Sequence, residues 1–131
     1  MVAEPDAIID HETQAREFLD LAREYLGHDN LHQASEKGWG AAAHMAKAVA
    51  LAQGWDYNTH AEFSVVLNNA TRATGDDRLL DLRATANELH SNYYRRKRHL
   101  DAAVIGRDLA KVSELLGLLT PLVETLESAD Q

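Results

Sequence analysis

Hydrophobic residues recur every three or four positions along almost the whole chain, which is the period of an amphipathic α-helix. No segment shows the alternation of apolar and polar residues that a half-buried β-strand would need. Glycine-containing polar segments divide the helical pattern into about five pieces. The pattern therefore predicts an all-α protein, an antiparallel up-down bundle of about five helices.

The first two helices are expected over residues 5–26 and 30–53, separated by Gly27, His28 and Asp29, which end one helix and cap the next. The apolar face of the first helix consists of Ile8, Ala15, Phe18, Ala22 and Tyr25 or Leu26. The face of the second consists of Leu31, Ala34, Gly38, Ala41 or Ala42, Met45, Val49 and Ala52. These small residues would let a neighbouring helix approach closely.

The remaining three helices follow the same rules. The third is expected to start with the capping-box pattern Thr59-His60-Ala61-Glu62 and to end at Gly75. The fourth should span residues 76–98, with the core stripe Leu79, Leu82, Ala86, Leu89 and Tyr93. The fifth begins near Asp101, and Pro121 should kink or restart it. Its packing seam is Ile105, Leu109, Val112, Leu116, Leu119, Val123 and Leu126.

Length and composition narrow the function classes. The 131 residues fit a single domain, 1–131, with a core from about residue 5 to 127. The chain has no cysteine, which excludes a disulfide framework and a thiolate metal site. A net charge of −8 argues against general binding to polyanions but leaves room for a small basic site. Without a signal peptide or an apolar run of membrane-spanning length, we expect a cytoplasmic protein with no membrane partner.

A polar stripe runs along the fourth predicted helix, at the edge of its core face. The stripe consists of Arg83, Asn87, His90 and Tyr94, at positions i, i+4, i+7 and i+11. A basic run follows directly, formed by Arg95, Arg96, Lys97 and Arg98. A cleft or a subunit interface is expected where such a stripe meets the core boundary.

These residue types suit RNA cleavage by the RNA's own 2′-hydroxyl group, which needs no metal or other cofactor. Histidine can transfer the proton, and arginine can stabilise the charge on the phosphorus centre. We therefore interpret Arg83 and His90 as candidate catalytic residues and the rest of the stripe, with Arg95, Arg96 and Arg98, as candidate substrate-binding residues. The structural alternative is that a boundary stripe is merely half-solvated and that the cations offset the negative end of the helix dipole.

Other residue patterns favour structural roles. His28, His32 and Glu36 are spaced by four, as metal ligands on one helix face would be, but a loop at His28 would break that geometry. His44, Trp39 and Trp55 are interpreted as packing residues, and His60 as a polar residue in the first turn of a helix. A tetratricopeptide array is disfavoured, because the fifth helix is too long and the Trp39 region has no second copy.

Two segments carry a resemblance to a known superfamily. They are residues 34–42, Ala-Ser-Glu-Lys-Gly-Trp-Gly-Ala-Ala, and residues 89–94, Leu-His-Ser-Asn-Tyr-Tyr, with Thr59-His60 between them. In order and spacing the chain resembles the PaREP-type branch of the HEPN superfamily from about Ala22 to Leu122. The resemblance implies a bundle of four or five helices, a homodimer and, in many members, a metal-independent endoribonuclease. Some members are toxins paired with a nucleotidyltransferase-type antitoxin.

The HEPN motif is an arginine, four to six residues and a histidine, often with a polar residue directly after the arginine. Arg83 and His90 match with six residues between them, and Arg23 and His28 match with four. Ala84 departs from the polar position, a role that would fall to Asn87. If it does not, the protein is an inactive or binding-only member.

Three functional hypotheses follow from this sequence. The first is an RNA-associated protein, a metal-independent endoribonuclease or a toxin-like component. The second is a non-catalytic dimeric module that binds a nucleotidyltransferase-type partner protein or a nucleotide. The third is a small-ligand pocket near Trp39 and the alanine-rich face of the second helix.

Overall fold

The computed structural model describes the backbone of residues 5–129 and the side chains of residues 5–124. Its helices are α1 (Pro5–Gly27), α2 (Leu31–Gln53), α3 (His60–Thr74), α4 (Arg78–Asn92), the 3₁₀ helix η1 (Lys97–His99) and α5 (Ala102–Ala129). Within this part of the chain there is no β-strand, so the all-α prediction is confirmed. None of the described helices has both the length and the apolar character needed to cross a membrane.

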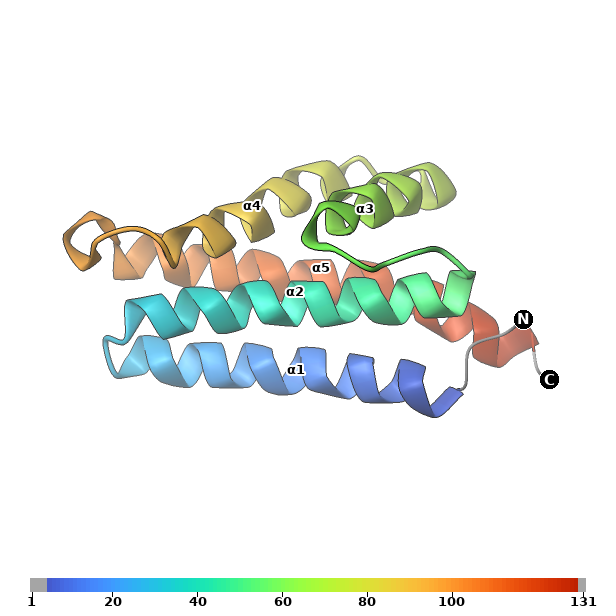
Figure 1. Ribbon diagram of the computed structural model, residues 1–131, viewed down its shortest axis with the longest axis horizontal. Coiled ribbons are helices and arrows are strands. Elements are labelled where there is room, and N and C mark those ends of the chain that lie inside the picture. Colours follow the sequence, from blue (N-terminus) through green and yellow to red (C-terminus); the bar gives the residue numbers. More distant parts are fainter. Residues whose placement is uncertain (1–4, 130–131) are drawn as a thin grey trace.

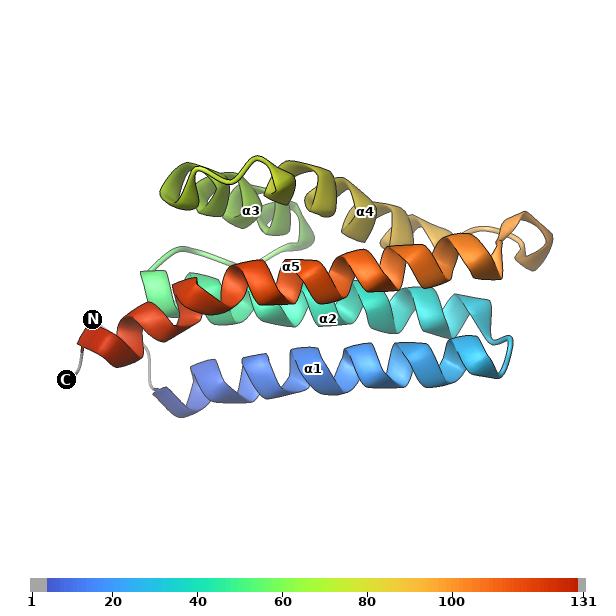
Figure 2. The same cartoon turned by 180° about the vertical axis from the view of Figure 1, so that it is seen from behind.

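Helix α2 lies at the centre of the bundle and packs against the other four α-helices (Figure 1). Helix α1 runs along one side of α2, and the α3–α4 pair lies on the opposite side (Figure 1). The view from behind shows α5 lying along α2 (Figure 2). The loop after α2 turns back, so α3 begins beside the middle of α2, where the rings of Trp39 and His60 are 5.7 Å apart.

The small residues of α2 allow this close packing, as their pattern predicts. More than half of the residues of α2 are buried. A Cβ atom added at Gly38 would lie 2.5 Å from Leu109 Cδ2 and 3.1 Å from Leu89 Cδ1. One added at Gly40 would lie 2.6 Å from the Phe18 ring. Glycine therefore sets the distance from α2 to α5 and α4 on one face and to α1 on another.

Most of the predicted core positions are confirmed. Helix α4 buries Leu79, Leu82, Ala86 and Leu89, and α5 buries Ile105, Leu109, Val112, Leu116, Leu119 and Val123. Helix α1 buries the predicted Ile8, Ala15 and Ala22, and also Leu19, while the neighbouring Phe18 is half-buried beside Gly40. Leu126 lies outside the described side chains.

Two predictions about the fourth helix are wrong. Helix α4 ends at Asn92, six residues before the predicted end at Arg98. Tyr93, predicted to be in the core, is 48% exposed, because the chain leaves the helix there and the ring turns to solvent. The basic run therefore lies in the loop between α4 and α5 and not in the last turn of a helix.

Other helix ends differ in detail from the prediction. Asn30 caps α2, because its side chain accepts a hydrogen bond from the Gln33 amide, 3.4 Å away. Thr59 is the N-cap residue of α3, but its side chain makes no capping bond, so the predicted capping box does not form. Helix α5 continues through Pro121, and the predicted restart does not occur.

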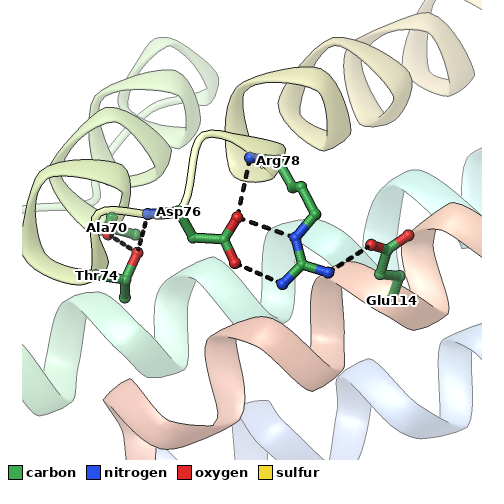
Figure 3. Close-up of polar contacts among 5 residues, drawn as sticks. All are labelled: Ala70, Thr74, Asp76, Arg78 and Glu114. Atoms are coloured by element: carbon green, nitrogen blue, oxygen red, sulfur yellow. Dashed lines mark hydrogen bonds and ion pairs between the residues drawn. The ribbon is translucent and has the colours of Figure 1, made fainter.

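The turn between α3 and α4 is held by local polar contacts (Figure 3). Thr74 Oγ1 donates to the Ala70 carbonyl and accepts from the Asp76 amide. The Asp76 carboxylate accepts from the Arg78 amide and guanidinium, and Arg78 also lies 3.6 Å from Glu114 of α5. These contacts with Arg78 lower the pKa of the Asp76 carboxyl below its usual value. The turn is thereby tied to the next helix.

Two histidines pair between α1 and α2. The Nδ1 atoms of His11 and His44 are 3.1 Å apart, and the Phe18 ring packs edge-on against His44. Burial, with the nearby charge of Lys47, lowers the pKa of His44 to about 4 and lowers that of His11 as well. The pair is therefore neutral at pH 7, and the N–H of one ring donates a hydrogen bond to the other ring.

We expect Gly38→Ala to lower the free energy of unfolding by about 1–2 kcal/mol, because overlap of the new methyl with Leu109 outweighs the better helix propensity of alanine. Gly106→Ala is the matched control, since its Cβ would meet only Leu26 at 3.5 Å. This control should gain about 0.5–1 kcal/mol. Urea denaturation measures both, and a gain in both variants would contradict the close approach of α2 and α5.

Acid should destabilise the fold through His44. The unfolded histidine binds a proton near pH 6.5 and the folded one near 4, so the unfolded state holds more protons between these values. The free energy of unfolding is therefore expected to fall as the pH drops from 6.5 to 4. His44→Gln should weaken this dependence in urea titrations at stepped pH, whereas replacement of the exposed His28 should not. If the free energy of unfolding depended on pH equally in the wild type and in His44→Gln, the acid sensitivity would not come from His44.

Candidate functional site

A polar ladder joins α3 to α4. On α3 it consists of His60, Ser64 and Asn68, spaced by four, and on α4 of Arg83, Asn87 and His90. Because the two helices run in opposite directions (Figure 1), the residues meet in reverse order. The predicted stripe is thus not an open surface but one side of a contact between two helices.

The ladder has three rungs of different strength. Arg83 Nη1 donates to Asn68 Oδ1 over 2.7 Å, and both side chains are half-buried. Asn87 Nδ2 lies 3.5 Å from Ser64 Oγ, a weak contact at the surface. The third rung is the stacked pair of the His60 and His90 rings. Arg83 and Asn87 are therefore bound to α3 rather than turned toward the histidines.

The two histidines stack at the end of the ladder nearest to α2. Their ring centroids are 5.2 Å apart with an angle of 28° between the planes. The His90 ring also lies 4.8 Å from the ring of Trp39, which is 3% exposed. His90 Nδ1 is buried and has no hydrogen-bond partner among the described residues. An imidazole placed in this way has a rigid position and an unsatisfied nitrogen.

Two tyrosines extend the histidine pair toward solvent. Tyr94 is 77% exposed, and its ring meets that of His90 edge-on at 6.0 Å. Tyr93 packs edge-on against Tyr94. Exposed neighbouring aromatic rings are the kind of surface on which nucleic-acid bases stack. Tyr94 thus joins the site from the turn after α4 and not from the helix itself.

Contacts of the basic loop divide its four cations into two groups. Arg95 bonds to Glu88 and to Asn92 Oδ1, and Lys97 pairs with Asp29 at 2.9 Å. Arg96 and Arg98 are exposed and have no carboxylate partner among the described residues. Within the basic loop, Arg96 and Arg98 are therefore the cations that a carboxylate does not already neutralise, although Arg98 Nε also donates to His99 Nε2.

A buried polar contact holds this loop to the core. Asn92 and Ser35 are 5% and 0% exposed, and Asn92 Nδ2 donates to Ser35 Oγ over 3.2 Å. The other end of the Asn92 amide accepts from Arg95. The two segments that carry the sequence resemblance, residues 34–42 and 89–94, therefore meet at this contact.

One histidine near the start of α2 contacts the basic loop. His32 Nε2 lies 2.6 Å from the carbonyl oxygen of Arg95 and so binds the basic loop. His28 lies in the turn between α1 and α2. No group of three histidine or carboxylate side chains in the described part of the chain is arranged to hold a metal ion.

The sequence profile of the archaeal PaREP1/PaREP8 family matches residues 10–116. The chain belongs to the archaeal PaREP1/PaREP8 family. The matched segment contains the polar ladder, the tyrosines and the basic loop, so the whole candidate site lies inside the PaREP1/PaREP8 region. No curated protein and no solved structure matches the chain.

Two residues of the site in this PaREP1/PaREP8 protein, His60 and Trp39, were not predicted from the sequence as functional. His60, interpreted as a polar residue of a first turn, stacks on His90, and Trp39 packs beneath both rings. A signal was present, because His60, Ser64 and Asn68 repeat every four residues on the third helix. A polar repeat of this kind becomes informative only once a second polar stripe is known to face it.

Asn92→Ala is expected to lower the free energy of unfolding by about 1–3 kcal/mol, because it leaves the buried Ser35 hydroxyl without its partner and releases Arg95. Asn69→Ala serves as the control, since Asn69 bonds only to Arg72 at the surface. Its effect should stay below about 0.5 kcal/mol. Chemical denaturation of both variants checks this, and equal losses would show that the buried contact has no special weight.

Proposed function

We propose that this protein cleaves RNA without a metal ion, at a HEPN-like site centred on His60 and His90. The single observation that carries the proposal is the stacked histidine pair, with its buried nitrogen unpartnered and with Tyr94 exposed above it. Arg96 and Arg98 on the adjoining loop have no carboxylate partner among the described residues, and they supply positive charge on an acidic protein.

Two adjacent imidazoles match the two proton transfers of this reaction. One neutral ring takes the proton of the RNA 2′-hydroxyl while that oxygen attacks the neighbouring phosphorus. The other ring, protonated, gives its proton to the departing 5′-oxygen. The products are a 2′,3′-cyclic phosphate and a free 5′-hydroxyl, so atoms and protons balance. Bases on either side of the cleaved bond would stack on Tyr93 and Tyr94.

The role proposed for Arg83 differs from that of the histidines. Seven residues of α-helix rise about 10.5 Å, so Arg83 starts almost two turns from His90. Its guanidinium is also held by Asn68. We therefore assign Arg83 to positioning α3 and, with it, His60 within one chain. In the homodimer that the HEPN resemblance implies, a second copy would contribute its own stripe to a shared groove.

One observation favours the second candidate function, a non-catalytic dimeric module for a nucleotidyltransferase-type partner. The ladder satisfies Arg83 and Asn87 through α3, as a purely structural contact would. The departure at Ala84 points in the same direction. Under this hypothesis the exposed tyrosines and the basic loop form the partner-binding surface.

The test is cleavage of a mixed RNA pool in the presence of a chelator. His90→Ala and His60→Ala should each lower the cleavage rate by about 10²–10⁴-fold, the usual effect of removing a general acid or base. His28→Ala, on the exposed turn after α1, should cleave as wild type. Circular dichroism of each variant verifies that the helices remain.

Two results would contradict this proposal. Equal cleavage by the wild type and both site variants would place the activity elsewhere or in a contaminant. No cleavage by a folded wild-type protein would favour the interaction module. The next experiment would then be to test a nucleotidyltransferase-type protein for binding, with Tyr94→Ala as the variant expected to lose it.

A further inference from the structure

Two neighbouring cavities lie along the second half of α2. The first borders α1, and the second borders the start of α3 at His60. One, of about 250 Å³, is lined by His11, Trp55 and Asp56 among others. The second, of about 230 Å³, is lined by Thr59 and His60. Lys47, Tyr57 and Asn58 line both cavities, so the three residues form the wall between them.

Lys47 is a half-buried cation that forms no ion pair within the described part of the chain. Its ammonium lies 5.7 Å from the centre of the Tyr57 ring. A partly desolvated charge is stabilised by an anion or by strong hydrogen bonds. The position of Lys47 at the wall of two cavities makes it accessible to an anionic ligand from either side.

The tyrosine beside it has an unused hydrogen-bond donor. The Tyr57 hydroxyl is buried and has no hydrogen-bond partner among the described residues. Burial and the nearby Glu62 raise its pKa to about 12, so the hydroxyl keeps its proton at pH 7. A buried hydroxyl without a partner costs free energy, which an acceptor in the cavity would recover.

The charges around the two cavities differ. The first is lined by Asp56, a carboxylate, and by His11, whose pair with His44 is neutral at pH 7. The second has no carboxylate in its lining, and besides Lys47 its lining residues carry an amide, two hydroxyls and an imidazole. The Thr59 hydroxyl makes no capping bond and so remains available to a ligand. The second cavity therefore suits an anion better than the first.

We infer that Lys47 is the centre of a phosphate-binding site. The phosphate lies in the cavity beside Thr59 and His60, where it accepts hydrogen bonds from Lys47 and Tyr57. The rest of the ligand lies in the cavity beside Trp55. A lysine ammonium, as a compact charge with three donors, is a usual ligand of phosphate.

This site adjoins the histidine pair without depending on it for binding. His60 is common to the two places, since it lines the second cavity and stacks on His90. If the proposed cleavage is right, the site holds a phosphate of the RNA strand next to the bond that is cut. If it is not, the same site takes a small phosphorylated molecule.

The first experiment measures binding by isothermal titration calorimetry with two probes, inorganic pyrophosphate and a single-stranded 2′-O-methyl oligoribonucleotide that cannot be cleaved through its 2′-position. Lys47→Gln should weaken binding at least tenfold. Lys111→Gln, on the exposed surface of α5, is the matched control and should bind as wild type. Binding of pyrophosphate indicates a small-molecule site, and binding of the oligonucleotide alone indicates a strand site.

Tyr57→Phe provides a second, independent readout. Loss of the unpartnered hydroxyl should raise the melting temperature of the free protein and at the same time weaken binding of the probe. The Lys47→Gln measurement reads binding and not cleavage, which separates this inference from the proposed cleavage. Wild-type affinity in Lys47→Gln, or no binding of either probe by the wild type, would overturn the phosphate site whatever the cleavage assay finds.

Discussion

The close approach of α1, α4 and α5 to α2 is the constraint on which the rest of this structure depends. It requires positions without side-chain bulk on two faces of one helix, at Gly38 and Gly40, with alanines between larger residues. Interiors of proteins are packed to crystal-like density, so each such position allows a neighbouring helix to come closer than a side chain would permit. The α3–α4 pair lies over the side of α2 opposite α1 (Figure 1).

On that side of α2, an aromatic residue interrupts the run of small residues. Trp39 is a large ring among small residues, and the histidines of α3 and α4 lie against it. Helix α3 is shorter than α2 and begins beside its middle. The Trp39 ring packs against the first turn of α3 there. An apolar support beneath two imidazoles gives them fixed positions, which a catalytic pair needs and which a structural pair would share. The same arrangement is therefore compatible with both candidate functions, and RNA cleavage is the property that distinguishes them.

The two proposed sites lie along one line of the molecule. The Lys47 cavities, the His60–His90 pair, Tyr94 and the basic loop follow α2 from its C-terminal half toward its N-terminus. Cations at both ends of this line, on a protein with a net charge of −8, would hold an extended polyanion in one place and repel it elsewhere. His60 belongs to both sites, so ligand binding at Lys47 would be felt directly at the histidine pair.

Local patterns were enough to determine the helices, the small-residue face of α2 and the core stripes of α4 and α5, because side-chain burial repeats with the period of the helix itself. They also singled out Arg83 and His90. Tertiary structure decided the rest. It ended α4 at Asn92, where the amide bonds to Ser35 of another helix, and so placed Tyr94 and the arginines on a loop. It also bound Arg83 to Asn68 and joined His60 to His90, thirty residues apart along the chain. Periodicity reports which face of a helix is buried, but not which side chain of another helix lies opposite.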